Sequence, residues 1–292
     1  MMIKHWILAT RPKTLWAGAC PVILGTAFAY SAESLHLPSA LAALIGALLI
    51  QIGTNFANDY YDGLKGTDDA DRKGPPRAVA SGLISPQTMK RATIVTMLLV
   101  FVPGAYIFLR GGVPFLIIGL VSIASGIAYT GGPYPLAYNG LGDLFALIFF
   151  GPVAVAGTFY LQAYSLPPEV VIAGFSPGLF SVAILTVNNL RDIEGDARAN
   201  KRTLPVRFGP GFAKAEYVGS IFIATILIPV SICIYVGGHY PALFATLVFL
   251  IAIPGYHTVF TKTDGPALNA VLANTGKYLL IFTILFSIGW IL

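Results

Sequence analysis

Residues 39–62 read SALAALIGALLIQIGTNFANDYYD, and this segment indicates a helix that crosses a membrane and ends in a polar face. Within this segment no charged residue precedes Asp59. A helix needs roughly 20 apolar residues to cross bilayer hydrocarbon about 30 Å thick. The polar side chains at its end are Asn55, Asn58, Asp59 and Asp62. Their spacing of i, i+3, i+4 and i+7 puts them on one helical face. Because the rest of the helix is apolar, this face must look into a cavity.

The composition places the whole chain in a membrane. Of 292 residues, 56% are hydrophobic and 11% are charged, whereas soluble domains carry about 25% charged residues. So few charges cannot cover a protein of this size in water, which excludes soluble globular, disordered, collagen-like and disulfide-stapled classes. The net charge of +5 does not indicate nucleic-acid binding, because the basic residues cluster in loops and form no stripe interleaved with exposed aromatic residues.

Apolar runs of about membrane-spanning length recur along the chain. We count nine, which predicts an all-α, multi-pass transmembrane bundle in a single domain, residues 1–292. Only Arg110, Gly111 and Gly112 separate the third run from the fourth, so eight and ten helices are the alternatives. The predicted helices are residues 14–31, 39–59, 91–109, 113–130, 141–164, 170–190, 213–236, 240–260 and 268–291.

The positions of Lys and Arg predict the orientation of the bundle. Nine helices place the N-terminus and the loops after the second, fourth, sixth and eighth helices on one face, and these segments hold 16 of the 18 Lys and Arg residues. The opposite face has Arg110, and Lys277 lies within the last helix. Because short cytoplasmic loops are enriched in Lys and Arg, we expect a cytoplasmic N-terminus and a C-terminus on the other side.

Two loops on the basic face carry most of the acidic residues. Residues 58–91 hold five Asp and residues 191–214 hold three acids, which together are eight of the 13 in the chain. Asp192 and Asp196 stand one helical turn apart, so two carboxylate pairs occupy the same membrane depth. Oxygen ligands at this density suit Mg²⁺, which commonly bridges carboxylates to substrate phosphates. These loops therefore predict a Mg²⁺ site that binds a polyphosphate.

Basic residues beside the acidic pairs fit a phosphate ligand. Arg77, Lys201 and Arg202 can hold phosphate oxygens and neutralise a leaving group. The alternative is that these acids and bases are solvated loop charges that pair with one another. We favour the metal site because both clusters share their spacing and their membrane face, whereas Asp69 and Asp71 have no matching partner and fit solvated charges.

Other polar positions near the same face are candidates with alternatives of their own. Tyr129 ends the fourth helix, where its ring could shield a cation, although tyrosine is also common in the aromatic belt of membrane proteins. Asp143 is an acid at the membrane edge, near the start of the fifth helix, and such acids are functional candidates. Arg11 and Lys13 fit topology anchors as well as a second, functional role.

These motifs resemble those of the UbiA-type intramembrane prenyltransferase superfamily, whose members carry Asp-rich motifs in the loops after helices two and six. Within the superfamily, the chain resembles the 1,4-dihydroxy-2-naphthoate polyprenyltransferases of menaquinone biosynthesis. The motifs that carry the resemblance are Arg11-Pro12-Lys13-Thr14, Asn58-Asp59-Tyr60-Tyr61-Asp62 with Gly66 and Asp68, Tyr129-Thr130-Gly131-Gly132-Pro133, Asn188-Asn189-Leu190-Arg191-Asp192 with Asp196 and Lys201-Arg202-Thr203-Leu204, and Leu268-Asn269 with Thr275-Gly276.

The resemblance implies a nine-helix bundle around a central cavity, with a lateral opening through which a long isoprenoid tail lies in membrane lipid. It implies an active site on the cytoplasmic side of the cell membrane, with Mg²⁺ as the cofactor. The Mg²⁺ ligands that it implies are Asn58, Asp62 and Asp68 for one ion and Asp192 and Asp196 for the other.

The implied reaction transfers a polyprenyl group from a polyprenyl diphosphate to 1,4-dihydroxy-2-naphthoate, with loss of CO₂ and diphosphate, and gives demethylmenaquinone. Asp59 is a candidate for the base that deprotonates the acceptor, and Asp143 is a weaker one. The remaining implied roles are diphosphate binding by Arg77, Lys201 and Arg202 and shelter of the allylic cation by Tyr129.

Two departures from the superfamily bear on the branch and on the site. In the 4-hydroxybenzoate enzymes three residues separate the last two acids of the first motif, whereas five separate Asp62 from Asp68. The loop after the fourth helix has Ala137, Tyr138 and Asn139 where some members carry Lys, which puts a basic role for this loop in doubt.

Two alternative functions remain open on the sequence. One is a prenyltransferase for another aromatic acceptor, 4-hydroxybenzoate or homogentisate. The other is a cation-coupled transporter, which predicts acids at helix centres and inverted repeats. Here the acids lie at helix ends on one face, which favours the enzyme.

Overall fold

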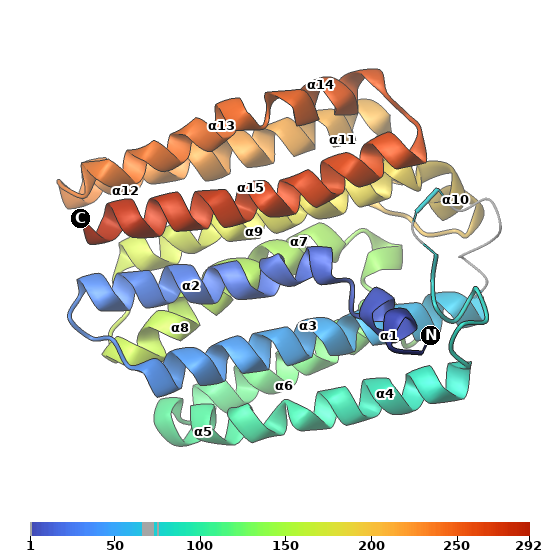
Figure 1. Cartoon of the computed structure of the whole chain (residues 1–292), viewed down its shortest axis with the longest axis horizontal. Coiled ribbons are helices and arrows are strands. Elements are labelled where there is room, and N and C mark those ends of the chain that lie inside the picture. The colour runs from blue at the N-terminus through green and yellow to red at the C-terminus, as the bar shows by residue number, and fades with distance from the viewer. Residues whose placement is uncertain (1, 66–72, 75) are drawn as a thin grey trace.

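The computed structural model of the chain consists of helices and contains no strand among the residues that it describes, which are 2–65, 73–74 and 76–292 (Figure 1). The first half contains α1 (Met2–Thr10), the short 3-10 helix η1 (Pro12–Thr14), α2 (Leu15–Ser31), α3 (Leu37–Lys65), α4 (Pro86–Leu99), α5 (Phe101–Gly111), α6 (Val113–Ala128), α7 (Gly142–Ile148), η3 (Phe149–Val153) and α8 (Ala154–Ala163). The second half contains α9 (Pro168–Arg191), α10 (Ile193–Arg198), α11 (Leu204–Phe222), α12 (Ile228–Val236), α13 (Leu247–Ile251), α14 (Ile253–Thr261) and α15 (Gly265–Ile291).

Within the described residues, eight helical segments are long and apolar enough to cross a membrane. The remaining predicted helix, residues 113–130, is the shorter apolar helix α6. The prediction of an all-α, multi-pass membrane bundle of about nine helices is therefore confirmed. The eight segments are Ile3–Ser31, Leu37–Lys65, Pro86–Gly111, Gly142–Ala163, Pro168–Arg191, Leu204–Val236, Tyr240–Thr261 and Gly265–Ile291.

Several of these segments consist of more than one helical piece. The segment Pro86–Gly111 breaks at Val100, between α4 and α5, just before Pro103. The segment Gly142–Ala163 contains the π-helical turn η3 around Gly151 and Pro152. Proline lacks a backbone N–H and clashes with the preceding turn, which explains a break at each place. Apolar runs alone do not reveal such breaks.

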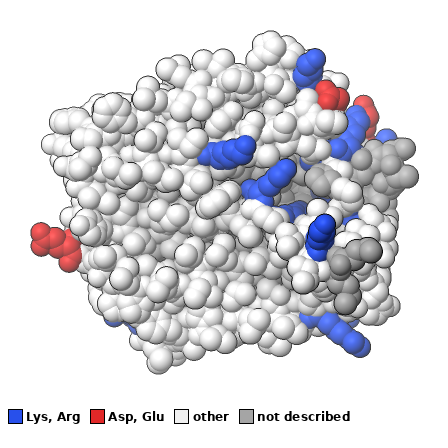
Figure 2. Space-filling view, viewed as in Figure 1, with Lys and Arg blue, Asp and Glu red and all other residues white. Residues whose placement is uncertain are grey.

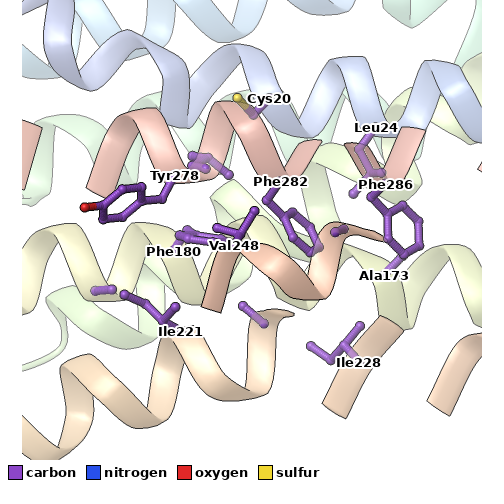
Figure 3. Packing of buried hydrophobic residues seen from close by; sticks show 14 of the residues in the cluster. Cys20, Leu24, Ala173, Phe180, Ile221, Ile228, Val248, Tyr278, Phe282 and Phe286 are labelled. Carbon is purple, nitrogen blue, oxygen red and sulfur yellow. The ribbon is translucent and has the colours of Figure 1, made fainter. Parts of the chain in front are cut away.

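The core of the bundle lies where α2, α9 and α15 pack together. Phe180 of α9 lies 5.5 Å from Phe282 of α15, measured between ring centroids, and Phe28 of α2 lies 4.6 Å from Trp290. Figure 3 shows Phe180, Phe282 and Phe286 among the aliphatic side chains of neighbouring helices. Because lipid tails are as apolar as these side chains, close packing holds the helices together in a membrane.

The outer surface of the bundle is apolar along its helices. Val102, Leu109 and Ile234 are 71%, 82% and 73% exposed, which in water would be unfavourable and in lipid is expected. Figure 2 shows that most charged side chains visible on one face gather toward the end that carries α10 and the N-terminus. An apolar belt with charges at one end is the surface of a multi-pass membrane protein.

Candidate active site

A cavity of about 660 Å³ lies between α2, α3, α5, α6, α7, α8 and α9, and most of its wall is apolar. Charged residues gather at the end where α3 and α9 terminate. The charged residues of this end, with the amides, hydroxyls and phenol beside them, are Arg11, Thr14, Asn55, Asn58, Asp62, Arg77, Tyr129, Thr130, Asn188, Asn189 and Lys201.

Asn58 and Asp62 lie one turn apart near the end of α3, and both line the cavity, as their spacing predicts. The side-chain oxygen of Asn58 accepts a 2.9 Å hydrogen bond from the hydroxyl of Thr130. One oxygen of Asp62 is 3.3 Å from the Arg77 guanidinium, and the other accepts a 3.2 Å hydrogen bond from the hydroxyl of Tyr138. Two oxygen-bearing side chains from one helix therefore reach the charged end of the cavity.

Asp59 lies on the same helix but is not among the described residues that line the cavity. Its buried carboxylate accepts hydrogen bonds from the backbone N–H groups of Ala78 at 3.0 Å and Val79 at 3.1 Å. The expectation that all four polar residues of this helix end face the cavity is therefore wrong for Asp59. The reason is that the loop carrying Arg77 folds back against α3, and its buried N–H groups need acceptors.

Asp192 lies between α9 and α10 and is paired with the residue before it. The Nε and Nη2 atoms of Arg191 donate to the two carboxylate oxygens of Asp192 at 2.9 and 2.5 Å. The same guanidinium donates to the side-chain oxygens of Asn188 at 2.8 Å and Asn269 at 2.5 Å. Arg191 therefore fixes the position of Asp192 and ties the end of α9 to α15.

Asp196 completes the second acidic pair one turn later. Its Oδ1 atom is 3.3 Å from Nζ of Lys201, which lines the cavity. Its Oδ2 atom is buried and has no hydrogen-bond partner among the described residues. Burial raises the pKa of Asp196 above its ordinary value, and the nearby ammonium of Lys201 opposes the shift. This carboxylate therefore has an unsatisfied oxygen that a cation would stabilise.

The loop after α6 takes part in the site through Tyr138. The ring of Tyr138 lies 4.1 Å from Nζ of Lys65 and 5.8 Å from Nζ of Lys201, measured to the ring centroid. Lys65 also donates a 2.6 Å hydrogen bond to the carbonyl of Thr130. The loop has no lysine of its own. Instead, the ring of Tyr138 lies near Lys65 and Lys201, and its hydroxyl donates a hydrogen bond to Asp62. Sequence reasoning missed Tyr138, although the absence of Lys from residues 137–139 marked the place.

Arg11 is a cavity residue whose place the sequence alone did not settle. It has a left-handed backbone conformation, with φ 51° and ψ 67°, just before η1. It lines the charged end of the cavity, and its Nη2 atom is buried with no hydrogen-bond partner among the described residues. Strained backbone of this kind is often found at binding sites. Arg11 therefore adds a third cation to those of Arg77 and Lys201.

Tyr129 follows α6 and lines the cavity, and burial raises the pKa of its hydroxyl, which keeps the phenol neutral. Asp143 lies in the first turn of α7 and lines a small separate recess with Tyr129, Asn189 and Thr203. Its Oδ1 atom is buried and lacks a hydrogen-bond partner in the described part of the chain. Tyr129 and Asn189 therefore stand between Asp143 and the cavity.

Three other predicted site residues in the described part of the chain, Asp192, Asp196 and Arg202, are not among the residues that line the cavity. Arg202 is exposed and does not line the cavity, although its backbone N–H donates a 3.1 Å hydrogen bond to the carbonyl of Tyr138. Asp68, together with Asp69 and Asp71, lies in residues 66–72, outside the residues that the structure describes.

The chemistry of the donors fits Mg²⁺, which takes oxygen ligands and is usually held by one or two carboxylates plus substrate phosphates. The ends of α3 and α9 also direct the negative ends of their helix dipoles toward this place. Within the described ranges, no three His, Cys, Asp or Glu side chains come close enough together to hold a metal ion. A metal here would therefore be held by carboxylates together with amide and substrate oxygens.

Comparison with known proteins gives the same assignment at the level of the family. The model of the UbiA prenyltransferase family matches residues 19–287. The chain is 38% identical to the 1,4-dihydroxy-2-naphthoate octaprenyltransferase of Escherichia coli, over 98% of this chain and 94% of that protein. It is 40% identical to the protein of the same name from Mycobacterium tuberculosis, over 76% of each chain.

A solved structure has the same fold. The UbiA homolog from Archaeoglobus fulgidus bound to GPP and Mg²⁺ matches with a TM-score of 0.69 at 17% sequence identity, over 98% of this chain and 99% of that chain. With a family model that covers most of its length and relatives of nearly 40% identity, the chain belongs to the UbiA prenyltransferase family.

Proposed function

We propose that this protein transfers a polyprenyl group from an allylic diphosphate to 1,4-dihydroxy-2-naphthoate, with loss of diphosphate and CO₂, and so forms demethylmenaquinol, the reduced form of demethylmenaquinone. The observation that carries the proposal is a cavity of about 660 Å³ that is apolar along most of its wall and charged at one end. Such a cavity suits a donor with an apolar tail and a diphosphate head. Relatives named for this reaction support the choice of acceptor.

We place the diphosphate at the charged end, against Arg11, Arg77 and Lys201. Arg77 and Lys201 are paired with Asp62 and Asp196 in the structure, at 3.3 Å each. When the donor binds, each base exchanges its carboxylate for phosphate oxygens, and each carboxylate becomes free to bind a cation. Diphosphate binding by Arg202, which is exposed, stays a prediction.

We assign Mg²⁺ as the cofactor. Asp62 and Asn58 would hold one ion, with Asp68 as a further predicted ligand, and Asp192 and Asp196 would hold the other. Mg²⁺ held by these residues would supply charge stabilisation to the diphosphate as a leaving group. The unsatisfied Oδ2 atom of Asp196 and the oxygen ligands of α3 support this assignment.

The remaining residues act on the acceptor and the allylic cation. The neutral ring of Tyr129, at the cavity wall, shelters the cation from water. The carboxyl-bearing ring carbon of the acceptor then forms the new C–C bond, and the carboxylate leaves as CO₂. Of the two candidate bases, Asp143 adjoins Tyr129 and has an unsatisfied oxygen, whereas both oxygens of Asp59 already accept hydrogen bonds. We therefore place Asp143 ahead of Asp59 as the base.

The proposal includes a single transmembrane domain of residues 1–292 with its active site on the cytoplasmic side of the cell membrane. The distribution of Lys and Arg supports the cytoplasmic location of the active site. Of the 18 Lys and Arg residues, 16 lie in the N-terminus and in the loops after the second, fourth, sixth and eighth predicted helices.

The test is a turnover assay on purified protein in detergent with Mg²⁺ and geranylgeranyl diphosphate. One arm receives 1,4-dihydroxy-2-naphthoate and the other 4-hydroxybenzoate, and mass spectrometry of the lipid extract identifies the product. We expect a prenylated, decarboxylated naphthoate that disappears when EDTA is added. A product from 4-hydroxybenzoate alone would overturn the acceptor, and no product with any donor length would overturn the reaction.

A further inference from the structure

The cavity face of α3 carries four side chains with amide or carboxylate groups, and one of these groups lacks a partner. Gln51, Asn55, Asn58 and Asp62 follow the helical spacing i, i+4, i+7 and i+11, and all four line the cavity. Asn55 donates a 2.9 Å hydrogen bond to the carbonyl of Thr10. Asn58 accepts from a threonine hydroxyl, and Asp62 contacts a guanidinium and a phenol. The amide of Gln51 has no hydrogen-bond partner among the described residues.

A second glutamine, Gln162 of α8, shows how a buried amide is satisfied in this protein. Gln162 is 5% exposed, and its side-chain oxygen accepts a 3.2 Å hydrogen bond from the backbone N–H of His36. Its side-chain nitrogen donates to the carbonyl of Thr158 at 3.0 Å. Gln51 is 9% exposed and makes no such contacts in the described part of the chain. Because a buried amide without hydrogen bonds is unfavourable, a molecule in the cavity has to supply the partner of Gln51.

The wall around Gln51 leaves its amide open to the cavity. Gly18 of α2 lies opposite, where an added methyl group would be 3.7 Å from the Cβ atom of Gln51. Gly18 has no side chain to cover the amide, and it lines the cavity itself. The adjoining cavity residues of α3, Ala47 and Ile50, are apolar. Gln51 therefore presents a polar group within an apolar stretch of the wall.

The prenyl donor does not provide a partner for this amide. Its isoprenoid tail is a hydrocarbon, and its diphosphate belongs at the charged end with Arg77 and Lys201. Gln51 precedes Asn58 by seven residues, which is about 10 Å along the helix at about 1.5 Å per residue. When tail and acceptor fill the cavity and displace water, the amide pairs with the acceptor or stays unsatisfied. The aromatic acceptor, which carries hydroxyl groups, is the substrate that can satisfy it.

The chemistry of the acceptor indicates which of its groups meets Gln51. The carboxyl-bearing ring carbon has to reach the allylic carbon beside the diphosphate, so this side of the ring faces the charged end. The 1-hydroxyl adjoins the carboxylate and faces the same way. The 4-hydroxyl points away from both, toward the apolar part of the cavity. A hydroxyl donates and accepts hydrogen bonds, and the amide of Gln51 offers both an acceptor and donors.

We infer that Gln51 binds the 4-hydroxyl of the aromatic acceptor and so determines the preference of the protein for a ring hydroxylated at that position. The inference rests on the proposed prenyl transfer. It adds an acceptor subsite, formed by Gln51 of α3 opposite Gly18 of α2, in which Gln51 is a substrate-binding residue.

The test removes the amide and measures the two substrates separately. Gln51→Met replaces the amide with an unbranched apolar side chain of similar length, and Gln51→Leu removes it with a different shape. Each variant is assayed with geranylgeranyl diphosphate and 1,4-dihydroxy-2-naphthoate, with each substrate varied in turn. We expect KM for the naphthoate to rise about tenfold, because one hydrogen bond is lost. KM for the diphosphate should change by less than about twofold.

An analogue without the 4-hydroxyl identifies the group that Gln51 binds. The probe is 1-hydroxy-2-naphthoate, used as a competitive inhibitor of the naphthoate substrate. The wild type should bind this analogue about tenfold more weakly than the substrate, because the amide stays unpaired. In Gln51→Met the inhibition constant of the analogue should change by less than about twofold, so that the difference between analogue and substrate disappears.

The matched control is Gln162→Met, which makes the same substitution at the buried glutamine outside the cavity lining. It removes the two hydrogen bonds of Gln162 and should lower the melting temperature in detergent. KM for the naphthoate and the inhibition constant of the analogue should both stay within about twofold of the wild type. Monodisperse elution in detergent shows that each variant is folded.

The outcomes separate this inference from the proposed function. A wild-type protein without turnover contradicts the proposed function itself. If the wild type is active, then an unchanged KM for the naphthoate in folded Gln51→Met, or an equal rise in KM for both substrates, overturns the acceptor subsite. Equal weakening of substrate and analogue in Gln51→Met overturns the contact with the 4-hydroxyl. The same rise in KM for the naphthoate in Gln162→Met would overturn the inference too, because the effect would then follow the loss of any buried amide.

Discussion

At the scale of single residues, Asp59 and Asp62 show how three positions on one helix separate two roles. Asp62 lines the cavity and meets Arg77 and Tyr138, whereas Asp59 turns away and accepts two backbone N–H groups. Their types and spacing predict that both residues face the cavity. The difference arises because the returning loop covers only one side of α3.

The role of Asp62 predicts a loss of activity without a loss of folding. Asp62→Asn keeps the shape of the side chain but removes its charge, so metal and donor binding weaken and turnover should fall by about 100-fold or more. The measurement is turnover with saturating donor, beside the melting temperature in detergent. Glu33→Gln, far from the cavity, is the control and should be fully active. An active Asp62→Asn protein would remove Asp62 from the metal site.

For Asp59, whose carboxylate accepts two backbone N–H groups, we expect a substitution to lower stability first and activity only as a consequence. In Asp59→Asn, one of the two acceptor oxygens becomes an NH₂ group that faces a backbone N–H, which should cost about 1–3 kcal/mol of stability. Thermal and denaturant unfolding in detergent measure this cost. If the variant were as stable as the wild type yet inactive, Asp59 would return to the place of the catalytic base.

At the scale of elements, hydropathy predicted where the helices run, and tertiary contacts determined where they bend. The run at 141–164 is one apolar stretch in the sequence, but in the structure it is α7, η3 and α8, bent at Gly151 and Pro152 against α9. The predicted helix at 39–59 continues to Lys65, which places Asp62 on a helix and aims it at the cavity. The hydropathy of a stretch of sequence predicts neither the bend nor the extension of the helix, since both depend on tertiary contacts.

The contact between η3 and α9 predicts a position-specific effect of an added methyl group. In Gly174→Ala the new methyl would meet the Cα of Pro152 at 2.7 Å, and the backbones must separate at a cost of about 1–3 kcal/mol. Gly219→Ala in α11 has nothing within 4 Å and should keep or slightly raise stability. Melting temperatures of both variants test the difference. Equal melting temperatures would mean that the close packing of η3 on α9 is not required.

At the scale of the whole molecule, the charged end of the cavity brings together parts of the chain that are distant in sequence. Asp62 comes from α3, Lys201 from the segment after α10, and Arg11 from the turn before α2. Three bases and Asp62 thus line one cavity in a protein whose surface is largely apolar along its helices. This arrangement gives two predictions that concern the assembled protein.

The first concerns removal of the metal. EDTA should abolish turnover, and excess Mg²⁺ should restore it, because paired carboxylates near the diphosphate need a cation to hold it. Helical content measured by circular dichroism should stay constant throughout, since the helices pack through apolar side chains. Turnover that survives EDTA would contradict a metal-dependent reaction.

The second concerns orientation in the membrane. A membrane-impermeant, cysteine-directed label should modify a cysteine-containing tag at the N-terminus only from the cytoplasmic side. It should modify the same tag at the C-terminus only from the opposite side. The native cysteines, Cys20 and Cys233, are buried and should stay unlabelled in the folded protein. Both tags labelled from the same side would contradict an odd number of spans.

Much of the candidate site was open to prediction from the sequence. The spacing of Asn58 and Asp62, the pair Asp192 and Asp196, and the neighbouring bases follow from helical periodicity and charge. The functions of Tyr138 and Arg11 did not follow, because each depends on a contact made across the bundle. Asp143 was found as a candidate, but its position behind Tyr129 became clear only in three dimensions.

Sequence therefore determines the class of the protein, the approximate number of its membrane-spanning runs and the end of the bundle at which charge collects. These properties depend on the composition of local stretches of the chain, so hydropathy and charge predict them directly. Tertiary structure alone determines that Asp59 holds a loop while Asp62 faces the cavity, that Arg11 lines the cavity, and that α7 packs on α9. These features depend on contacts between segments that are distant in the sequence, and such contacts produce no periodic pattern of residues along the chain.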